Sequence, residues 1–484
     1  MAARTGKEYL EGLKDDREVW IGKEKVDVLT HPAFQGSLKG MAGYFDWQHK
    51  FAEECLVKDE QSSQMMSASL LLPKNKQDLE ARGRCYEQLA KYSYGMLGRT
   101  PDYCNTALAG YAARADMFIE GGHSDWATNI VNFHREVVEK DLSLTHTIIQ
   151  PQPDKGQNDL AGINAEVALK VVERTKDYLV VRGAKILATL GPFADELYVY
   201  PAAPILGNAS ADHAVSFSVP VNTKGVITIC RDHYNVDGDI RDLPFSSRFD
   251  EQDAYVIFDD VKVPTSRIFM DGDIEFYNHM VFNHPGNNSN ITQQTCTRAA
   301  VKLEFAYDLC NKMANATNVQ NRQEIAIMLG EIWSYAATTR AALNAALNNA
   351  HDTGGGAFFL DDVPMRAMRC MLPSWMTRVN DIIKIIGSHN LLATPSLGAF
   401  DNPKMGKLLR EYMPGANDYS AEERAQIFRI AWDFAGSALG SRIELYERNY
   451  LRTQASNCMA SQMNAQKNFT WNQVEDFMLH AGMK

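Results

Sequence analysis

The order of helical and extended patterns along the chain is the feature that most constrains its fold. Apolar side chains recur every three or four positions over long stretches of the C-terminal half, namely 297–317, 322–349, 364–386 and 421–449. This spacing places the apolar residues on one face of an α-helix. Several long amphipathic helices in succession predict a helical bundle.

The segment that precedes the bundle has a different pattern of apolar residues. Between residues 144 and 272 the apolar runs are short and rich in β-branched residues, and turn residues such as Arg182-Gly183 separate them. Runs of this length and spacing are typical of strands in a compact β domain. We expect strands over 178–181, 185–189, 197–200, 215–219, 225–230 and 254–258.

The N-terminal part is predicted to be mostly helical. Apolar residues at three- and four-residue spacing run through 45–51 and 80–90, and a further helix is expected over 123–133 with Ser124 or Asp125 as its N-cap. The sequence therefore predicts an α+β protein with three domains. They are an N-terminal helical domain (1–143), a central β domain (144–272) and a C-terminal helical bundle (273–484).

Composition argues against several classes of protein, including nucleic-acid-binding and membrane-spanning ones. The 484 residues include 49 Lys and Arg against 60 Asp and Glu, a formal net charge of −11, which argues against nucleic acid or an anionic membrane as the main partner. No apolar run is long enough to span a bilayer, and the N-terminus has no apolar signal segment. The eight cysteines include no C-x-x-C pair. We expect free thiols, a cytoplasmic location and no metal centre, since no metal motif is present.

The turn around Arg99 is the first candidate site. Pro101 disfavours helical backbone at Thr100 and suits the first turn of a new helix, so the helical pattern over 79–97 should end before it. Arg99 and Tyr103 stand four residues apart and share a face if the backbone is nearly helical. A guanidinium and a phenol on one face can hold an anionic or phenolic oxygen. A helix corner with a packed arginine and tyrosine explains the same residues.

Four separated blocks connect this turn to a known family. They are GRTPDYC (98–104), LTHTIIQPQPDK (144–155), VRGAKILAT (181–189) and GSALGSR (436–442), which leads into ELYERNY (444–450). In this order they resemble the 4-hydroxyphenylacetate 3-monooxygenase family, the large oxygenase components of two-component hydroxylases that use reduced flavin. The resemblance runs almost end to end. It implies an acyl-CoA dehydrogenase-like fold, with the flavin between β domain and bundle.

The resemblance also implies catalytic roles for three residues. Arg99, Tyr103 and His146 match the family's contacts to the phenolic oxygen of the substrate. A cation and two polar groups would stabilise a phenolate, which is richer in electrons than a phenol and titrates near 10 when free. His146 could also accept the proton. As one of 12 histidines, His146 would by itself more simply be a core or surface residue.

Flavin contacts are implied for several segments. The loop over 152–155 would otherwise be a connector, and Thr189 an ordinary buried strand residue. Two glycines inside the helical run 421–449 cost about 1 kcal/mol each, so they indicate close helix packing or close approach of a flavin. Where this chain has Ala438-Leu439, related sequences often have an acidic–aromatic pair. The implied contacts are His146, Ile148, Gln152, Pro153, Asp154, Lys155, Thr189, Gly436, Ser437, Ala438 and Leu439.

The residues that match the family's substrate-carboxylate position depart from its pattern. That position often carries small hydroxyl residues, whereas this chain has Pro201 and Ala202, and proline lacks an N–H group. The loop 206–213 is slightly long and could be a lid over the substrate. Both points argue against 4-hydroxyphenylacetate itself as the substrate and leave a flavin-dependent oxygenase in place.

The resemblance thus implies a monooxygenase that acts on a small aromatic substrate. It would insert one oxygen atom ortho to a phenolic hydroxyl, or at an equivalent carbon of an electron-rich heteroaromatic acid, through a flavin C4a-hydroperoxide formed from FADH2 and O2. A separate flavin reductase would supply FADH2, because the chain has no nicotinamide-binding signature. The family forms homotetramers, which we also expect here.

Three alternatives share the fold. An acyl-CoA dehydrogenase would need a base from the bundle, for which Glu304 and Glu331 are candidates. A 4-hydroxybutyryl-CoA dehydratase would need cluster-binding cysteines where Arg99 and Tyr103 stand and a histidine at Ser289, so an iron–sulfur cluster is disfavoured. A relative without catalytic activity is disfavoured because Arg99, Tyr103, His146 and Thr189 are intact.

Overall fold

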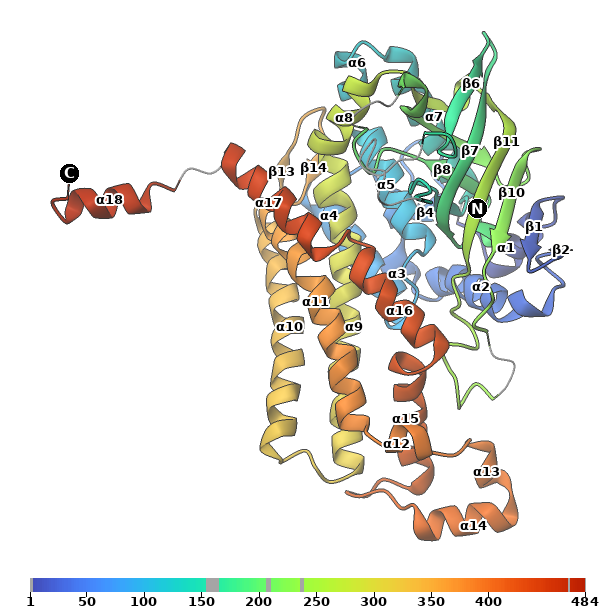
Figure 1. The fold of residues 1–484 in the computed structure, drawn as a ribbon, viewed down its shortest axis with the longest axis vertical. Coiled ribbons are helices and arrows are strands. Elements are labelled where there is room, and N and C mark those ends of the chain that lie inside the picture. The colour runs from blue at the N-terminus through green and yellow to red at the C-terminus, as the bar shows by residue number, and fades with distance from the viewer. Residues whose placement is uncertain (1–2, 154–164, 206–209, 236–238, 469–470, 484) are drawn as a thin grey trace.

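The computed structural model describes residues 3–153, 165–205, 210–235, 239–468 and 471–483. Its long helices form an elongated bundle, and the strands and most of the N-terminal helices gather at one end of it (Figure 1). The bundle includes α9 (Ile291–Ala316), α10 (Gln323–Asn348), α11 (Asp362–Gly387), α15 (Ala421–Ala435) and α16 (Ala438–Asn449). Helices α10 and α11 agree with the predicted ranges to within two residues, and α9 begins six residues before its predicted range. Their apolar stripes form one buried core.

The predicted single helix over 421–449 is wrong, because the structure contains two helices there. Helix α15 ends at Ala435 and α16 begins at Ala438. Ser437 has an extended backbone, and its hydroxyl accepts a hydrogen bond from the N–H of Gly440 at 2.9 Å, which caps the new helix. Of the two glycines in this run, Gly436 therefore lies at the break.

Two β-sheets pack through a common apolar core. The six-stranded sheet has the order β2-β1-β10-β11-β7-β6, and the four-stranded sheet has the order β12-β9-β8-β5. Val181, Val256 and Phe217 are among the buried residues between them. The strands are β1 (Glu18–Ile21), β2 (Glu24–Val26), β5 (Leu144–His146), β6 (Lys170–Arg174), β7 (Tyr178–Thr189), β8 (Glu196–Val199), β9 (Val215–Pro220), β10 (Val226–Cys230), β11 (Asp253–Pro264) and β12 (Ile268–Asp271).

The turn predicted at Arg182-Gly183 is wrong, because both residues lie inside the continuous strand β7. Gly183 has φ of +124°, and a Cβ atom there would come within 3.0 Å of the backbone of Ala168. Glycine serves here to let a neighbouring segment approach the strand closely. The two short strands predicted on either side of it are therefore one long strand.

The N-terminal part supplies helices and also two strands of the larger sheet. Its main helices are α2 (Gln35–Lys50), α4 (Lys76–Ser93), α5 (Pro101–Ala113) and α7 (Ser124–Lys140). Pro101 is the first residue of α5, as predicted. The N-cap prediction for α7 is wrong, since His123 holds that position without a side-chain cap bond. The hairpin β1–β2, which the sequence pattern did not reveal, pairs with β10 in parallel.

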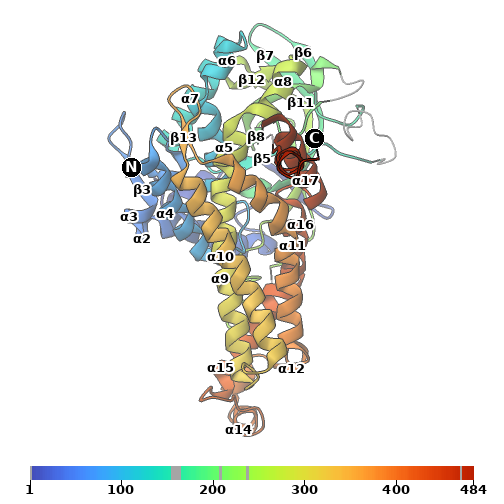
Figure 2. The same ribbon diagram turned by 90° about the vertical axis from the view of Figure 1, so that its left-hand side faces the viewer.

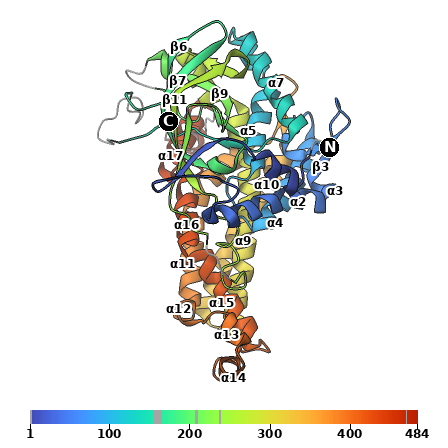
Figure 3. The same cartoon turned by 90° about the vertical axis from the view of Figure 1, so that its right-hand side faces the viewer.

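Shorter elements complete the described part of the chain. Helix α5 contacts α9 and β5, so it lies where the bundle meets the strands (Figures 2 and 3). The division of the chain at 143 and 272 stays a prediction. The remaining helices and strands are α1 (Gly6–Gly12), α3 (Ala52–Cys55), β3 (Leu56–Lys58), β4 (Met65–Ser67), α6 (Asp116–Glu120), α8 (Ile274–Asn283), β13 (His351–Asp352), β14 (Phe358–Phe359), α12 (Asn390–Ala393), α13 (Gly398–Asp401), α14 (Pro403–Tyr412), α17 (Gln454–Asn468) and α18 (Gln473–His480).

Candidate active site

Arg99 lies in the turn between α4 and α5, where its backbone is held by a carboxylate. The N–H groups of Gly98 and Arg99 both donate to Oε1 of Glu251, at 2.7 and 2.5 Å. On the side chain, Nη2 donates to the carbonyl of Tyr450 at 3.0 Å. The buried Nη1 has no hydrogen-bond partner among the described residues. The guanidinium thus keeps a charged donor for a ligand, because buried donors are normally paired.

Three tyrosine rings surround the Arg99 guanidinium. Its Cζ atom lies 3.8 Å from the ring centroid of Tyr103, 5.3 Å from that of Tyr446 and 5.2 Å from that of Tyr450. Tyr446 and Tyr450 stack on each other with centroids 4.7 Å apart. The negative faces of aromatic rings attract a cation. The rings therefore stabilise the buried charge without accepting hydrogen bonds from its N–H groups. A carboxylate would stabilise the charge too, but it would occupy those groups.

His146 ends strand β5 beside this group. Its ring centroid lies 5.4 Å from that of Tyr103. Burial, and then the positive charge of Arg99, lower the pKa of His146 well below the usual 6.5, against the opposing effect of Asp253. The imidazole is therefore neutral at pH 7, and its buried Nδ1 has no partner in the described part of the chain. A neutral imidazole is able to accept a proton.

The three predicted catalytic residues are thus neighbours in space, although 47 positions separate Arg99 from His146 in the chain. The turn before α5 supplies Arg99, the first turn of α5 supplies Tyr103, and β5 supplies His146. All three side chains are at least nine-tenths buried. The arrangement can bind a phenolic oxygen next to a fixed positive charge and a neutral base, and the individual roles stay predictions.

A charge network that the sequence pattern did not reveal joins the site to α16. Glu251 accepts a hydrogen bond from Nη1 of Arg442 through its second oxygen, at 2.5 Å. Asp253 accepts from Nη2 and Nε of the same arginine, at 2.5 and 2.9 Å, and from the hydroxyl of Thr189 at 2.9 Å. The network connects the turn of Arg99, the end of β7 and α16. Strands and bundle therefore position the site together.

The sequence held a usable signal for part of this network. Arg442, Tyr446 and Tyr450 follow one another at four-residue spacing, which places them on one face of α16 and its C-cap. Arg298 and Lys302 show the same spacing on α9, and both pair with the buried Glu447, at 2.9 and 2.8 Å. Glu251 and Asp253 carry no such helical signal, because Glu251 lies just before β11 and Asp253 is the first residue of that strand.

Gly98 allows the Tyr446 ring to approach the turn. A Cβ atom at this position would come within 3.0 Å of three ring atoms of Tyr446. Gly98→Ala is therefore expected to lower the free energy of unfolding by about 1–3 kcal/mol, as overpacking in a tight core does. Gly330→Ala is the matched control, since a Cβ there meets nothing within 4 Å on α10. It should stabilise the protein by about 0.5–1 kcal/mol in the same urea titration. Equal stability of wild type and Gly98→Ala would contradict the packing described.

The predicted flavin-contact residues lie in several environments. Ile148 is half-buried after β5, Thr189 is buried at the end of β7, and Gln152 and Pro153 are exposed. Asp154 and Lys155 lie outside the described residues. Gly436, Ser437, Ala438 and Leu439 form the junction of α15 and α16, one turn before Arg442. The structure brings Thr189 next to the strand of His146, because its carbonyl accepts a hydrogen bond from the Thr145 hydroxyl.

A second buried cation lies next to the predicted flavin contacts. The amine of Lys185 on β7 donates to the carbonyl of Ile148 at 3.3 Å, and no carboxylate pairs with it among the described residues. Burial lowers the pKa of Lys185 to about 7. Together with the unpaired donor of Arg99, this amine fits a large polar ligand such as a flavin, which carries ring oxygens and phosphates. The residues present are therefore compatible with FAD.

Lys185 predicts a pH dependence of stability. The folded protein loses the Lys185 proton near pH 7, whereas the unfolded chain keeps it to about 10.5. The unfolded state binds more protons in this window, so this residue makes the free energy of unfolding rise from pH 7 toward pH 10. Lys185→Met should therefore stabilise the flavin-free protein most at pH 7 and least at pH 10 in urea titrations. Lys224→Met, at an exposed lysine, should show no such trend. A difference that is the same at both pH values would contradict the assignment.

The glycine pattern has a structural explanation at Gly440. A Cβ atom there would come within 3.0 Å of the Phe434 carbonyl. Close approach of α16 to the end of α15 therefore accounts for this glycine, one of the two interpretations of the sequence. The loop predicted as a lid, 206–213, lies partly outside the described residues, and the rest of it holds a short helical turn at Ala211–His213.

Pro201 and Ala202 follow β8 and lie near the site. The Tyr111 hydroxyl donates to the Pro201 carbonyl at 3.4 Å, and Nη2 of Arg452 donates to the Ala202 carbonyl at 2.6 Å. Pro201 is buried and Ala202 half-buried. Neither residue offers a side-chain donor to a substrate carboxylate.

The alternatives on the same fold find little support in the site. Glu304 pairs with Arg340 at 2.7 Å, and Glu331 pairs with Arg378 at 3.0 Å, on the outside of the bundle. Neither glutamate is therefore available as the base of a dehydrogenase. In the described ranges of the chain, no group of three or more His, Cys, Asp and Glu side chains is arranged to hold a metal ion. The described residues also contain no helix with the length and apolar character needed to cross a membrane.

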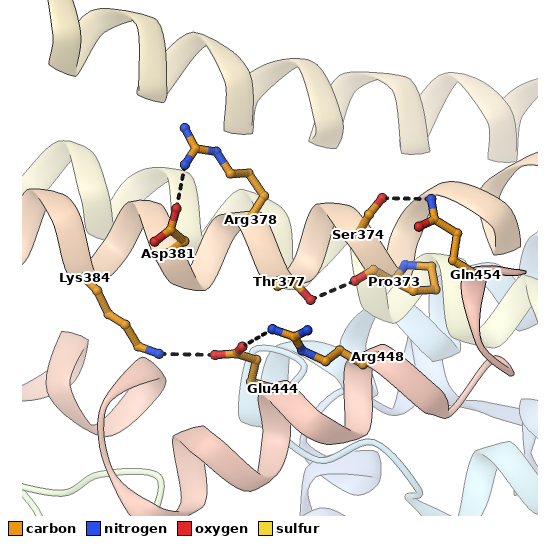
Figure 4. A pocket seen from close by; sticks show the side chains of 9 residues that line it. All are labelled: Pro373, Ser374, Thr377, Arg378, Asp381, Lys384, Glu444, Arg448 and Gln454. Carbon is orange, nitrogen blue, oxygen red and sulfur yellow. Dashed lines mark hydrogen bonds and ion pairs between the residues drawn. The ribbon is translucent and has the colours of Figure 1, made fainter.

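A surface cavity of about 580 Å³ lies on the bundle, between α11 and α16. Figure 4 shows Glu444 between Lys384 and Arg448, with ion pairs of 3.2 and 2.8 Å. Arg378 and Asp381 in its lining also pair, at 2.6 Å. Its charged groups are paired with one another, so the cavity lacks the unpaired donors of the Arg99 site. The buried group around Arg99 remains the candidate active site.

Comparison with known proteins confirms the family and the fold. The family model for the 4-hydroxyphenylacetate 3-hydroxylase N terminal matches residues 5–270, and that for its C terminal matches residues 279–480. The 4-hydroxyphenylacetate 3-monooxygenase oxygenase components of Thermus thermophilus and Geobacillus sp. are each 34% identical; the alignments cover 92% of this chain and 91% and 90% of theirs. A 4-nitrophenol 2-monooxygenase oxygenase component from Rhodococcus is 30% identical over 92% of this chain and 85% of its own.

Solved structures agree with this result. A crystal structure of a 4-hydroxyphenylacetate 3-monooxygenase oxygenase component in complex with FAD and 4-hydroxyphenylacetate superposes with a TM-score of 0.90 at 31% identity, over 99% of this chain and 98% of the other. An archaeal 4-hydroxybutyryl-CoA dehydratase shares the fold, with a TM-score of 0.85 at 18% identity over 100% of this chain and 95% of its own. The predicted acyl-CoA dehydrogenase-like architecture is confirmed. The protein belongs to the 4-hydroxyphenylacetate 3-hydroxylase family, the oxygenase components of flavin-dependent aromatic monooxygenases.

Proposed function

We propose that this protein hydroxylates a phenolic substrate at the carbon next to its hydroxyl group, with one oxygen atom from O2 and electrons from reduced FAD. Family membership supports the reaction class and the cofactor. The observation that carries the proposal is the buried Arg99 guanidinium with an unpaired donor, next to Tyr103 and a neutral His146. These groups suit a substrate whose reactive form is a phenolate.

Arg99 and Tyr103 bind the phenolic oxygen in this mechanism. A buried positive charge favours the ionised form of a neighbouring acid, so Arg99 lowers the pKa of the bound phenol. The effect is strong because little water screens charges in a buried site. The tyrosine rings around Arg99 leave its Nη1 group available for this oxygen.

His146 accepts the phenol proton. Its lowered pKa keeps it neutral and ready to act as a base at pH 7. A general base in the correct position contributes roughly two to four orders of magnitude to a rate. The resulting phenolate carries its highest electron density at the ring carbons beside and opposite the oxygen, which directs oxygen insertion.

Several residues would hold the flavin between strands and bundle. We assign this role to Ile148, Gln152, Pro153, Asp154, Lys155, Thr189 and the junction 436–439, with the Lys185 amine available to an anionic group of the cofactor. Reduced FAD, when bound, supplies the activated oxygen that attacks the ring. The chain's own contribution is the buried position of Arg99, Tyr103 and His146, which keeps water away from this chemistry.

A flavin reductase is the partner that this reaction requires, since FADH2 must be supplied from outside the chain. The family's description as an oxygenase component supports such a partner. We further propose that the protein is a homotetramer and acts in the cytoplasm. The eight cysteines, six of them buried and free, suit a reducing compartment.

The proposal is tested with anaerobically reduced FAD, the purified protein and a panel of para-substituted phenols, mixed with air-saturated buffer. Chromatography measures the hydroxylated product, and a peroxidase assay measures hydrogen peroxide. We expect at least one phenol to give a catechol at the expense of peroxide, whereas the matching methyl ethers, which cannot ionise, give only peroxide. Peroxide as the sole product with every phenol would contradict the proposed function.

A further inference from the structure

Tyr200 places a buried hydroxyl group beside the candidate active site. The residue directly follows β8 and is only 3% exposed. Its hydroxyl has no hydrogen-bond partner among the described residues. Buried polar groups are normally paired, so an unpaired one calls for an explanation such as a bound ligand or a catalytic role.

The pairing of β5 with β8 sets the direction of the Tyr200 side chain. The two strands run parallel with His146 opposite Tyr198, and the N–H of Thr147 donates to the Tyr198 carbonyl at 3.0 Å. Side chains two positions apart in extended chain lie on the same face of a sheet. The rings of Tyr198 and Tyr200 accordingly pack together, with centroids 4.8 Å apart. Tyr200 therefore lies on the face of the sheet that carries His146.

The neighbours of Tyr200 on this face belong to the candidate active site. Its ring centroid lies 6.0 Å from that of Tyr111 on α5, the helix whose first turn supplies Tyr103. Four neighbouring phenols raise the pKa of Arg99 against the effect of burial, and Tyr200 is one of them. Tyr103 also lies close to the Tyr200 hydroxyl, without the geometry of a hydrogen bond between the two phenols. The Tyr200 hydroxyl thus stands next to the groups predicted to bind the substrate oxygen.

The Tyr200 hydroxyl keeps its proton at the pH of the reaction. Burial, and then the Tyr103 phenol, raise the pKa of Tyr200 well above the usual 10, against the opposing effect of Arg99. A protonated phenol can donate a hydrogen bond to an anionic oxygen. In a buried site a fixed donor of this kind stabilises an anion strongly, because little water screens the interaction.

Two other tyrosines near Arg99 are less suited to this role. In the described part of the chain, the buried tyrosine hydroxyls without a partner are those of Tyr200, Tyr446 and Tyr450. Tyr446 and Tyr450 belong to α16 and its C-cap, on the bundle side of the site. Tyr200 follows the strand that pairs with the strand of His146. A substrate oxygen that gives its proton to His146 therefore lies on the side of Tyr200.

We infer that Tyr200 donates a hydrogen bond to the oxygen of the bound phenolate and is a further catalytic residue of the site. This inference rests on the proposed function and adds a residue to it. A phenolate oxygen accepts several hydrogen bonds at once. Arg99 and Tyr103 supply donors, and Tyr200 supplies another from the strand side once His146 has taken the proton.

The test measures the ionisation of a fluorinated phenol bound to the protein, which is loaded with reduced FAD under anaerobic conditions so that no turnover occurs. The probes are 4-fluorophenol and 3-fluoro-4-hydroxyphenylacetate. Their ¹⁹F chemical shifts differ between phenol and phenolate, so a titration from about pH 6 to about pH 10 gives the pKa of each bound probe. Wild type should hold this pKa below that of the free probe. Tyr200→Phe should raise it by about 1 or more, since a hydrogen bond to a charged group contributes that much.

Two comparisons show that the effect comes from the hydroxyl group. Tyr200→Phe keeps the ring that packs on Tyr198 and removes only an unpaired hydroxyl, so its midpoint of urea denaturation should stay close to that of wild type. Tyr198→Phe is the matched control on the same face of the sheet. Burial, and then Tyr111 and Cys104, raise the pKa of Tyr198, so its hydroxyl lies toward those residues. This variant should leave the pKa of the bound probe as in wild type.

The inference is overturned if Tyr200→Phe leaves the pKa of the bound probe unchanged, or if Tyr198→Phe raises it equally. It is also overturned if wild type binds neither probe, or binds them without lowering their pKa. The catechol assay separates each of these results from a failure of the proposed function. A wild type that forms catechol upholds the proposed function alone, whereas a wild type that forms none contradicts both claims.

Discussion

His146→Ala is expected to lower the rate of phenol hydroxylation by about 100-fold or more, the usual effect of removing a general base. Reduced FAD should still be consumed by O2, and hydrogen peroxide should replace the catechol. The reason is that His146 acts on the substrate proton, so the flavin reaction with O2 proceeds without it. Stopped-flow oxidation of FADH2, combined with product and peroxide analysis, measures both quantities.

The pH profile sharpens this prediction. Burial and Arg99 lower the pKa of His146 well below 6.5, so its imidazole stays neutral from pH 8 to below pH 6.5. The rate of hydroxylation by wild type should therefore fall only at more acidic pH. The His146→Ala variant should lack this acidic limb. His351→Ala, at an exposed histidine, is the control and should match wild type. Unchanged coupling of FADH2 oxidation to hydroxylation in His146→Ala would remove this residue from the mechanism.

Glu251→Ala is expected to destabilise the protein by about 3–5 kcal/mol, the cost of breaking a buried ion pair. The substitution removes the acceptor for the N–H groups of Gly98 and Arg99 and one of the two carboxylates that face Arg442. Urea denaturation followed by circular dichroism measures the loss. Any variant protein that folds should also bind substrate poorly, because the Arg99 turn loses its anchor.

Two controls separate the parts of this effect. Glu251→Gln keeps an oxygen acceptor for the two N–H groups and should be less destabilised than Glu251→Ala. Glu422→Ala removes a half-buried surface glutamate that pairs with the exposed Arg410 and should change stability by less than about 1 kcal/mol. If Glu251→Ala were as stable as Glu422→Ala, the network could not be what holds the Arg99 turn.

Much of the fold could be predicted from local patterns. The stripes over 297–317 and 322–349 predict α9 and α10 because each helix buries one face in a common core. Pro101 predicts the start of α5 because its ring fixes the backbone angle that a first turn needs. The hairpin β1–β2 was missed because its strands are short and gain stability from β10, about 200 residues later in the chain. Ser437 was missed as a helix start since apolar periodicity continues across the break.

The residues of the candidate site could be predicted where the sequence matches a block of the family or shows the spacing of a helix. The blocks around residues 99 and 146 located Arg99, Tyr103 and His146, which the structure brings together. Glu251 and Asp253 could not be found in this way, because each is one of 60 acidic residues and neither belongs to a helical repeat. Their importance arises only from the tertiary contact with Arg442.

The most direct test of the central claim is hydroxylation under isotopically labelled oxygen. Reduced FAD, protein and the best phenol from the panel are mixed with ¹⁸O2, and mass spectrometry follows the product. Activation of a phenol by Arg99, Tyr103 and His146 for oxygen insertion predicts a catechol with one ¹⁸O atom, on the ring carbon next to the original hydroxyl group. A product whose new oxygen comes from water, or ¹⁸O recovered only in hydrogen peroxide, would contradict the account.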